Sequence, residues 1–146
     1  MEGCPFCNDS EVLDREVARN SLAWAFLSNT PIVPRHILVV PVRHVAIFGE
    51  LTEQEWGAIM ELAQQLQQAL RRHFGAEGFN LAWNEGAIAG QSVAHFHLHI
   101  VPRTAGDTGI TEYEPRAFLY RPGTRETTPE SELRSVASEL QNTLKK

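Results

Sequence analysis

The sequence predicts an α+β fold, in which an antiparallel sheet of about five strands packs against one long helix, with a second helix near the C-terminus. Three observations support this prediction. Several short segments alternate apolar and polar residues with the two-residue period of a strand. One long segment repeats its apolar side chains every three or four residues, and a shorter helical stripe follows near the end of the chain. A chain of 146 residues is long enough for one compact domain.

The first three strands are expected in the N-terminal third of the chain. Apolar residues alternate loosely over residues 11–29, and this pattern predicts two antiparallel strands joined by a turn at residues 19–21. A third strand is expected at residues 36–40, because prolines flank this segment and proline cannot donate a hydrogen bond to a sheet.

Residues 52–75 carry the signals of a long amphipathic helix. Thr52 and Glu55 have the spacing of a capping box, and Gly75 is a typical C-terminal stop. The apolar side chains predicted to contact the sheet are Trp56, Ile59, Met60, Ala63, Leu66, Leu70 and Phe74.

Two further elements complete the predicted fold. Residues 79–84 alternate again and are expected to pair with the strand that follows them. Thr128 and Pro129 then begin a second helix, whose stripe needs a partner on the same domain or on a second subunit. This stripe consists of Leu133, Val136, Ala137, Leu140 and Leu144.

Three histidines alternate with apolar residues at His95, His97 and His99. The two-residue period predicts a strand that presents all three imidazoles on one face. One metal ion is not expected to bind all three, because the first and third residues lie about 13 Å apart along a strand. The small polar turn Gly90-Gln91-Ser92 precedes the row, and such a turn can offer N–H groups and a hydroxyl to an anion. The combination suggests a phosphate held beside a nucleophilic imidazole.

The turn and the three histidines resemble the signature of the histidine-triad (HIT) superfamily. The resemblance continues through residues 34–41 and 84–86, so it covers most of residues 20–110. Residues 32–34 and 102–107 are similar to the fragile-histidine-triad branch of dinucleoside polyphosphate hydrolases, whereas residues 84–86 resemble the nucleotide-binding phosphoramidase branch. The resemblance implies a single HIT-like domain over residues 1–146 and a homodimer. Residues 1–10 are a candidate zinc knuckle in this domain, and residues 108–146 a C-terminal extension.

The resemblance also implies a nucleotidyl hydrolase or transferase that cleaves an α-phosphate linkage in a dinucleoside polyphosphate or a nucleoside phosphoramidate. His97 is the implied nucleophile, which would form a covalent nucleotidyl-histidine that water later cleaves. Neutral imidazole suits this role, because it is abundant near pH 7 and attacks phosphorus when one ring nitrogen keeps its lone pair. Magnesium on a polyphosphate leaving group would assist. The expected substrate-binding residues are Ser28, His36, Asn84, Gly90, Gln91, Ser92 and His99.

Cys4 and Cys7 are the only cysteines, and their CxxC spacing provides two of the four ligands of a structural zinc site. A redox pair is the alternative, but the strand and helix pattern of a thioredoxin-like protein is missing around these cysteines. Some HIT proteins join such a pair to two histidines. By this resemblance, His44 and His95 are expected to complete a structural zinc site.

Two other functions remain open from the sequence. Ser28 stands where relatives carry Asp or Asn to contact ribose, which gives weight to a non-catalytic nucleotide-binding or sensing module. A protein whose purpose is metal binding is the other alternative, but it leaves His97 and His99 unexplained.

Composition and charge narrow the expected partners. The net charge is −5 with scattered basic residues, so no broad surface for a nucleic-acid backbone is expected. No signal peptide or membrane-spanning segment is recognised. The expectation is a cytoplasmic protein with a nucleotide substrate and with no nucleic-acid or membrane partner.

Overall fold

The computed structural model describes residues 1–109 and 126–145, so residues 110–125 of the predicted C-terminal extension lie outside the described residues. The described chain forms an antiparallel five-stranded sheet in the order β1-β2-β3-β5-β4. Its strands are β1 (Glu16–Arg19), β2 (Ala23–Leu27), β3 (Ile37–Pro41), β4 (Gly78–Ala82) and β5 (Leu98–Arg103). The predicted fold class is therefore confirmed, as is the pairing of β4 with β5.

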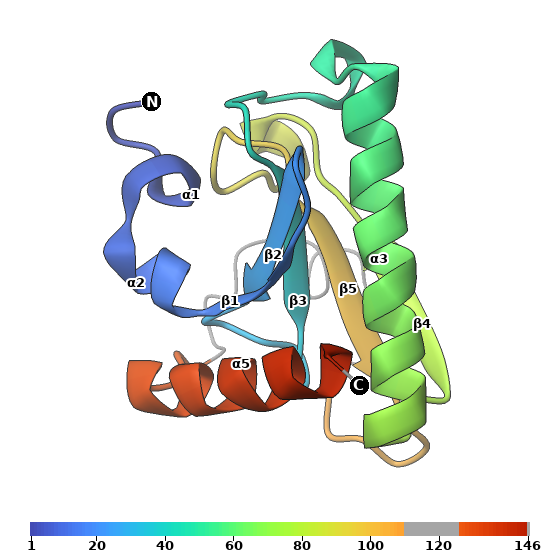
Figure 1. Cartoon of the computed structure of the whole chain (residues 1–146). Coiled ribbons are helices and arrows are strands. Elements are labelled where there is room, and N and C mark those ends of the chain that lie inside the picture. Colours follow the sequence, from blue (N-terminus) through green and yellow to red (C-terminus); the bar gives the residue numbers. More distant parts are fainter. Residues whose placement is uncertain (110–125, 146) are drawn as a thin grey trace.

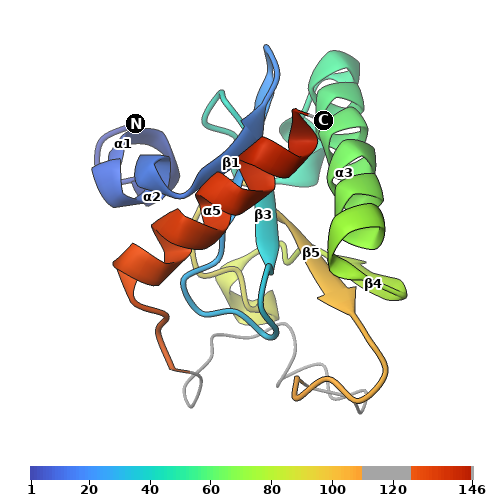
Figure 2. The ribbon, with the colours of Figure 1, turned by 60° about the horizontal axis from the view of Figure 1, so that its bottom comes forward.

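Helices cover both faces of this sheet. Figure 1 shows the short helices α1 and α2 on one side and the long helix α3 on the other. Figure 2 shows α5 crossing in front of β1, with its C-terminal end close to α3. The bounds are α1 (Pro5–Asn8), α2 (Ser10–Asp14), α3 (Glu53–Phe74) and α5 (Glu130–Leu144), with single 3₁₀ turns at Phe48–Glu50 and Ala87–Ala89.

The long helix begins and ends as its sequence predicts. The hydroxyl of Thr52 accepts a hydrogen bond from the N–H of Glu55 at 3.0 Å, and the Glu55 carboxylate accepts one from the N–H of Thr52 at 2.9 Å. This reciprocal pair satisfies two N–H groups that the helix itself leaves without partners. Gly75 then adopts φ +70°, which ends the helix in the left-handed conformation that glycine tolerates best.

The main core lies between the sheet and the two longer helices. Ile59, Leu66 and Leu70 of α3 are fully buried against the strands, and Leu133, Ala137 and Leu140 of α5 belong to the same cluster. The C-terminal helix therefore packs on its own domain. A second cluster on the opposite face joins the N-terminal segment to the sheet. It consists of Cys4, Phe6, Val12, Trp24, Phe26, Leu38 and Val40.

The structure corrects two predictions about strands. Residues 11–14 are helical, because the Asp9 carboxylate accepts a hydrogen bond from the N–H of Glu11 at 2.8 Å and caps α2. The ladder of β5 begins only at Leu98, so His95 and His97 precede it. Just before the ladder, the N–H of Phe96 donates to the carbonyl of Val45, which lies in a connection rather than in a strand.

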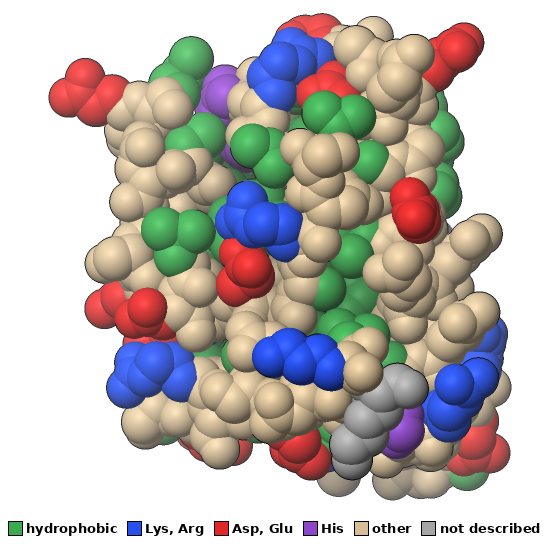
Figure 3. All heavy atoms as spheres, viewed as in Figure 1, with side chains coloured by type: hydrophobic (Ala, Val, Ile, Leu, Met, Phe, Trp, Pro, Cys, Tyr) green, Lys and Arg blue, Asp and Glu red, His purple; other side chains and the backbone are tan. Residues whose placement is uncertain are grey.

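The surface and the helices carry two further observations. Figure 3 shows basic and acidic side chains interspersed on the face seen in Figure 1. Within residues 1–109 and 126–145, no helix has both the length and the apolar character needed to cross a bilayer.

Candidate active site and metal centre

His97 lies directly before β5 and is 5% exposed. Its Nδ1–H donates a hydrogen bond to the carbonyl oxygen of His95 at 2.8 Å, because a carbonyl oxygen can only accept. The neutral ring then carries its lone pair on Nε2, to which no residue of the described chain donates a hydrogen bond. Burial lowers the pKa of His97, although the hydrogen bond to His95 opposes this effect. Burial therefore favours the neutral ring, whose lone pair lies on Nε2.

His99 is oriented by a chain of hydrogen bonds from the loop before β3. The N–H of Ile32 donates to Nδ1 of His36 at 3.1 Å, so His36 carries its own proton on Nε2. That Nε2–H donates to Nδ1 of His99 at 2.9 Å. The network thus assigns the proton of His99 to its Nε2 atom.

The rings of His97 and His99 lie 5.1 Å apart between centroids. Their tautomers are complementary, because Nε2 of His97 offers a lone pair and Nε2 of His99 carries a proton. A phosphate ester between them would meet a nucleophile and a hydrogen-bond donor.

The turn before the histidines is held mainly by its own hydrogen bonds. The Gln91 side chain accepts from the N–H of Gly86 at 2.8 Å and donates to the carbonyl of Ala46 at 2.9 Å. The N–H groups of Gly90 and Gln91 donate to carbonyls of the same loop, at Ala87 and Gly86. In contrast, neither the N–H nor the hydroxyl of Ser92 is bonded within the described residues, and Ser92 is exposed. Ser92 is therefore the group of this turn best placed to donate to an anion.

Asn84 and Ser28 occupy different places around the histidines. Asn84 is buried at the end of the 84–91 loop, and its amide lies 3.4 Å from the carbonyl of Gly90. Ser28 is also buried, and its hydroxyl accepts a hydrogen bond from the N–H of Thr30 at 3.2 Å. Ser28 and His36 are bridged directly by a backbone hydrogen bond of 2.9 Å.

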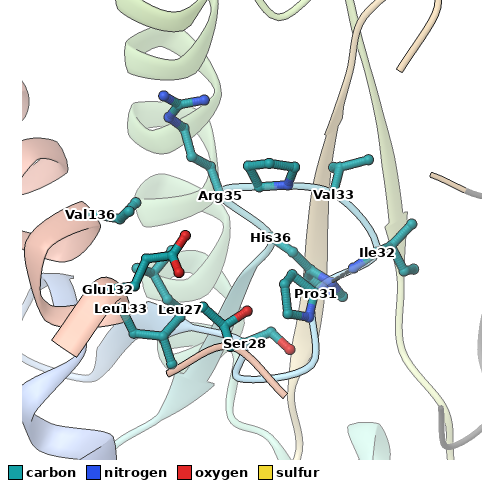
Figure 4. Close-up of a pocket in the computed structure, with 12 residues that line it drawn as sticks. Leu27, Ser28, Pro31, Ile32, Val33, Arg35, His36, Glu132, Leu133 and Val136 are labelled. Carbon is teal, nitrogen blue, oxygen red and sulfur yellow. Dashed lines mark hydrogen bonds between the residues drawn. The ribbon is translucent and has the colours of Figure 1, made fainter. Parts of the chain in front are cut away.

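Figure 4 shows a pocket between the loop of residues 28–36 and helix α5, with a cavity volume of about 160 Å³. Ser28 and Pro31 lie on its loop side, and Leu133 and Val136 on its helix side. Ile32 and His36 also line this pocket, so the loop that bounds it contains the hydrogen bond that orients His36.

The structure brings the four predicted metal ligands together. One ligand atom from each of Cys4, Cys7, His44 and His95 lies within 4.8 Å of all the others. Sγ of Cys4 and Sγ of Cys7 are both 3.5 Å from Nδ1 of His95, and Sγ of Cys7 is 3.4 Å from Nδ1 of His44. A tetrahedral zinc ion with ordinary bond lengths separates its sulfur and nitrogen ligands by about 3.6 Å. The cluster therefore fits zinc in both ligand type and spacing.

The chemistry of His95 also fits a metal ligand. Its Nε2–H donates to the carbonyl of Pro41 at 2.8 Å, which leaves the lone pair on Nδ1, the atom that faces both sulfurs. Burial lowers the pKa of His95 to about 4, so the ring is neutral at physiological pH. Burial also raises the pKa of the Cys4 thiol, which a bound zinc ion would reverse by binding the thiolate.

Sequence patterns missed two contacts that support this region. Arg43 forms a two-point ion pair with Glu55, with bonds of 3.0 and 2.7 Å, and thereby ties the loop that carries His44 to the start of α3. Phe6 packs its ring edge-on to His97, with centroids 5.3 Å apart. The capping box predicts the role of Glu55 at the start of α3. The contacts of Glu55 with Arg43 and of Phe6 with His97 have no signal in the sequence.

The fold and the histidine row define a histidine-triad type of protein. The HIT domain family model matches residues 9–106, and the chain belongs to this family. A HIT-like protein of Mycoplasma genitalium, MG132, is 39% identical over 102 residues, which cover 68% of this chain and 72% of that protein. A bis(5′-adenosyl)-triphosphatase of Dictyostelium discoideum is 33% identical over 121 residues, which cover 82% of this chain and 78% of that protein.

A solved structure shares this fold over most of its length. The crystal structure of a zinc-bound histidine-triad family protein from Mycobacterium smegmatis superposes with a TM-score of 0.73 and 24% identity. The match covers 98% of this chain and 94% of that one.

Proposed function

We propose that this protein is a nucleotidyl hydrolase or transferase that cleaves an α-phosphate linkage in a dinucleoside polyphosphate or a nucleoside phosphoramidate. The observation that carries the proposal is the hydrogen bond from Nδ1 of His97 to the carbonyl of His95, which leaves Nε2 as a nucleophile. Membership of the HIT family supports an enzyme of this type. Similarity to a protein named bis(5′-adenosyl)-triphosphatase supports dinucleoside polyphosphates as the first substrates to test.

The reaction has two steps. In the first step, Nε2 of His97 forms a bond to the α-phosphorus, the bond to the leaving group breaks, and the leaving group takes the electron pair. The ring then carries a positive charge, which the carbonyl of His95 stabilises through Nδ1–H. In the second step, water or another acceptor attacks phosphorus, and the bond to Nε2 breaks.

The neighbouring polar groups would hold the charge on the phosphate oxygens. His99 donates through Nε2–H, and His36 keeps it in that tautomer. Ser92 donates through its hydroxyl and N–H, and the Asn84 amide lies at the mouth of the same loop. Gly90 and Gln91 shape this loop, and Ser28 connects to His99 through His36. Magnesium would assist when the leaving group is a polyphosphate.

The metal proposed at Cys4, Cys7, His44 and His95 is a structural zinc ion. The separations of 3.4–3.5 Å between sulfur and nitrogen ligand atoms, and the two cysteines and two histidines themselves, support this assignment. Because all four ligands come from the protein, no open position is left for a substrate. Zinc would therefore brace the segment that carries His95 and leave the phosphate chemistry to His97.

A second copy of this chain is the proposed partner, with β4 at the interface. This strand is the last in the sheet order, and Leu81 is exposed on it, as is Trp83 directly after it. Trp83 stacks on exposed Phe48 at 5.3 Å, which extends the apolar edge. Among the described residues, no strand pairs with the outer edge of β4, and such an edge beside exposed apolar side chains fits pairing with an identical edge. Sedimentation should show a dimer that Leu81→Lys dissociates, whereas a wild-type monomer would contradict this proposal.

The test of the proposed activity uses diadenosine triphosphate. We expect release of mononucleotides, and an acid-quenched sample should carry an adenylyl group on the peptide that contains His97. His97→Asn should abolish both, whereas His73→Asn, at an exposed position on α3, is the matched control. Normal turnover by His97→Asn would overturn the proposal. Binding of AMP without any turnover by the wild type would favour a nucleotide-sensing module instead.

A further inference from the structure

The N-terminal segment that carries both cysteines has little support of its own. Helix α1 spans only four residues, which is too short to be stable in isolation. The backbone hydrogen bonds of residues 1–9 are local, such as the bonds from the N–H groups of Cys7 and Asn8 to the carbonyl of Cys4. In the part of the chain that the structure describes, no backbone hydrogen bond joins residues 1–9 to the sheet. The position of α1 therefore depends on its side chains.

Phe6 lies between the two cysteines and is the apolar anchor of this segment. Its side chain is buried against Phe26, with ring centroids 4.9 Å apart. The same ring stands edge-on to His97 at 5.3 Å and 80°, and to His95 at 5.9 Å and 70°. One aromatic ring thus touches both a proposed metal ligand and the proposed nucleophile.

The ring of His97 has contacts at several points. Its Nδ1–H is held by the carbonyl of His95, and His99 packs at 65° with its centroid 5.1 Å away. Phe6 supplies an aromatic contact from a different element of the chain. Without Phe6, the hydrogen bond would still anchor one atom, but the ring would gain freedom to tilt about it. In-line attack on phosphorus is sensitive to such a tilt, because it requires the lone pair to point at the reacting atom.

We propose that Phe6 is a positioning residue for His97, and that the metal centre keeps Phe6 in place by clamping the cysteines on either side of it. This inference rests on the proposed function, in which His97 is the nucleophile. His95 provides a second link, because its ring faces the cysteines while its carbonyl holds His97. Loss of the metal would loosen α1, so the ring of Phe6 would no longer be fixed against the His97 ring.

The test compares Phe6→Leu with Phe74→Leu, a matched change at the last residue of α3. Both proteins are prepared with zinc, and elemental analysis should give equal zinc per chain. Nitrogen-15 NMR of the imidazole rings should show one His97 tautomer, protonated at Nδ1, in the wild type and in Phe74→Leu. In Phe6→Leu, the His97 signals should broaden or double. With diadenosine triphosphate, kcat should fall about tenfold while KM changes little, since orientation and not binding is lost.

Two further arms make the result decisive. Phe6→Tyr keeps an aromatic edge and should recover the single set of His97 signals that Phe6→Leu loses. Removal of zinc from the wild type should produce the same signal changes as Phe6→Leu, and zinc addition should reverse them. Unchanged His97 signals in both Phe6→Leu and the zinc-free protein would overturn the inference. If the signals respond but the wild type never turns over substrate, the proposed function fails while the positioning role of Phe6 stands.

Discussion

The carbonyl oxygen of His95 lies 2.8 Å from Nδ1 of His97, so a residue whose ring faces two cysteines also sets the tautomer of its neighbour. The metal centre and the proposed nucleophile therefore share one short stretch of backbone. The ring of His95 faces the cysteines and its carbonyl binds His97, so a change at either site is expected to alter the geometry of the other.

The pH dependence of activity should report the environment of His97. Burial lowers its pKa below the usual value of 6.5, and only the neutral ring can attack. As the pH falls, kcat/KM should therefore stay constant through 6.5 and decline only at lower pH. A pH-rate profile with diadenosine triphosphate tests this, with His73→Asn as a control. A decline that begins at or above pH 6.5 would contradict a buried neutral nucleophile.

The zinc-free protein should lose stability in mildly acidic solution. His95 has a pKa of about 4 in the folded chain, against 6.5 as its ordinary value, so the unfolded state binds more protons between these values. The contribution of the neutral His95 ring to the free energy of unfolding is present above pH 6.5 and is lost as the pH falls toward 4. The total loss from this residue is about 3 kcal/mol. Urea unfolding at pH 7, 6 and 5 measures the free energy of unfolding. If this free energy falls with pH as steeply in His95→Gln as in the wild type, His95 is not the cause.

Zinc binding should need all four ligands. The wild type should hold about one zinc ion per chain, because four ligand atoms close one tetrahedral site. Cys7→Ser and His44→Ala should each weaken zinc affinity more than about 100-fold, since loss of a ligand exceeds the effect of losing an outer partner. Competition with a chromophoric chelator measures the affinity, and His73→Ala is the control. Full affinity in His44→Ala would remove His44 from the site.

The hydrogen-bond chain through His36 should matter for the reaction. His36→Leu removes the donor to His99 and allows the proton of His99 to move to Nδ1, so kcat should fall by about 100-fold. His36→Gln keeps an N–H donor and should retain more activity than His36→Leu. Steady-state rates with diadenosine triphosphate compare the two variants, and equal rates in both would show that the donor is unimportant.

Helix α5 should contribute to the stability of a single chain. Leu140 is fully buried in the main core, so Leu140→Ala should lower the free energy of unfolding by about 2–5 kcal/mol. Leu13→Ala, at a position that is 48% exposed, should change it by less than about 0.5 kcal/mol. Urea unfolding at two protein concentrations measures both effects. A loss that appears only at the lower concentration would mean that α5 packs on a partner subunit.

Several elements could be predicted because their signals are local. The capping box at Thr52 and Glu55 and the stop at Gly75 mark α3 within one residue at each end. The short helices α1 and α2 were missed, because four or five residues carry no detectable helical period. The three histidines alternate with apolar residues as expected, but the ladder of β5 begins only at Leu98. Just before it, the N–H of Phe96 donates to the carbonyl of Val45, which is not part of a strand.

By itself, the sequence determined the strands, the long helix and the types of residue available for chemistry, because strand and helix periods depend on neighbours a few positions away. Only the tertiary structure decided how those residues combine. Cys4 meets His95 across 91 positions of sequence, and His36 meets His99 across 63. Such contacts depend on the packing of the whole sheet, and they set which ring nitrogen holds a proton and which keeps its lone pair.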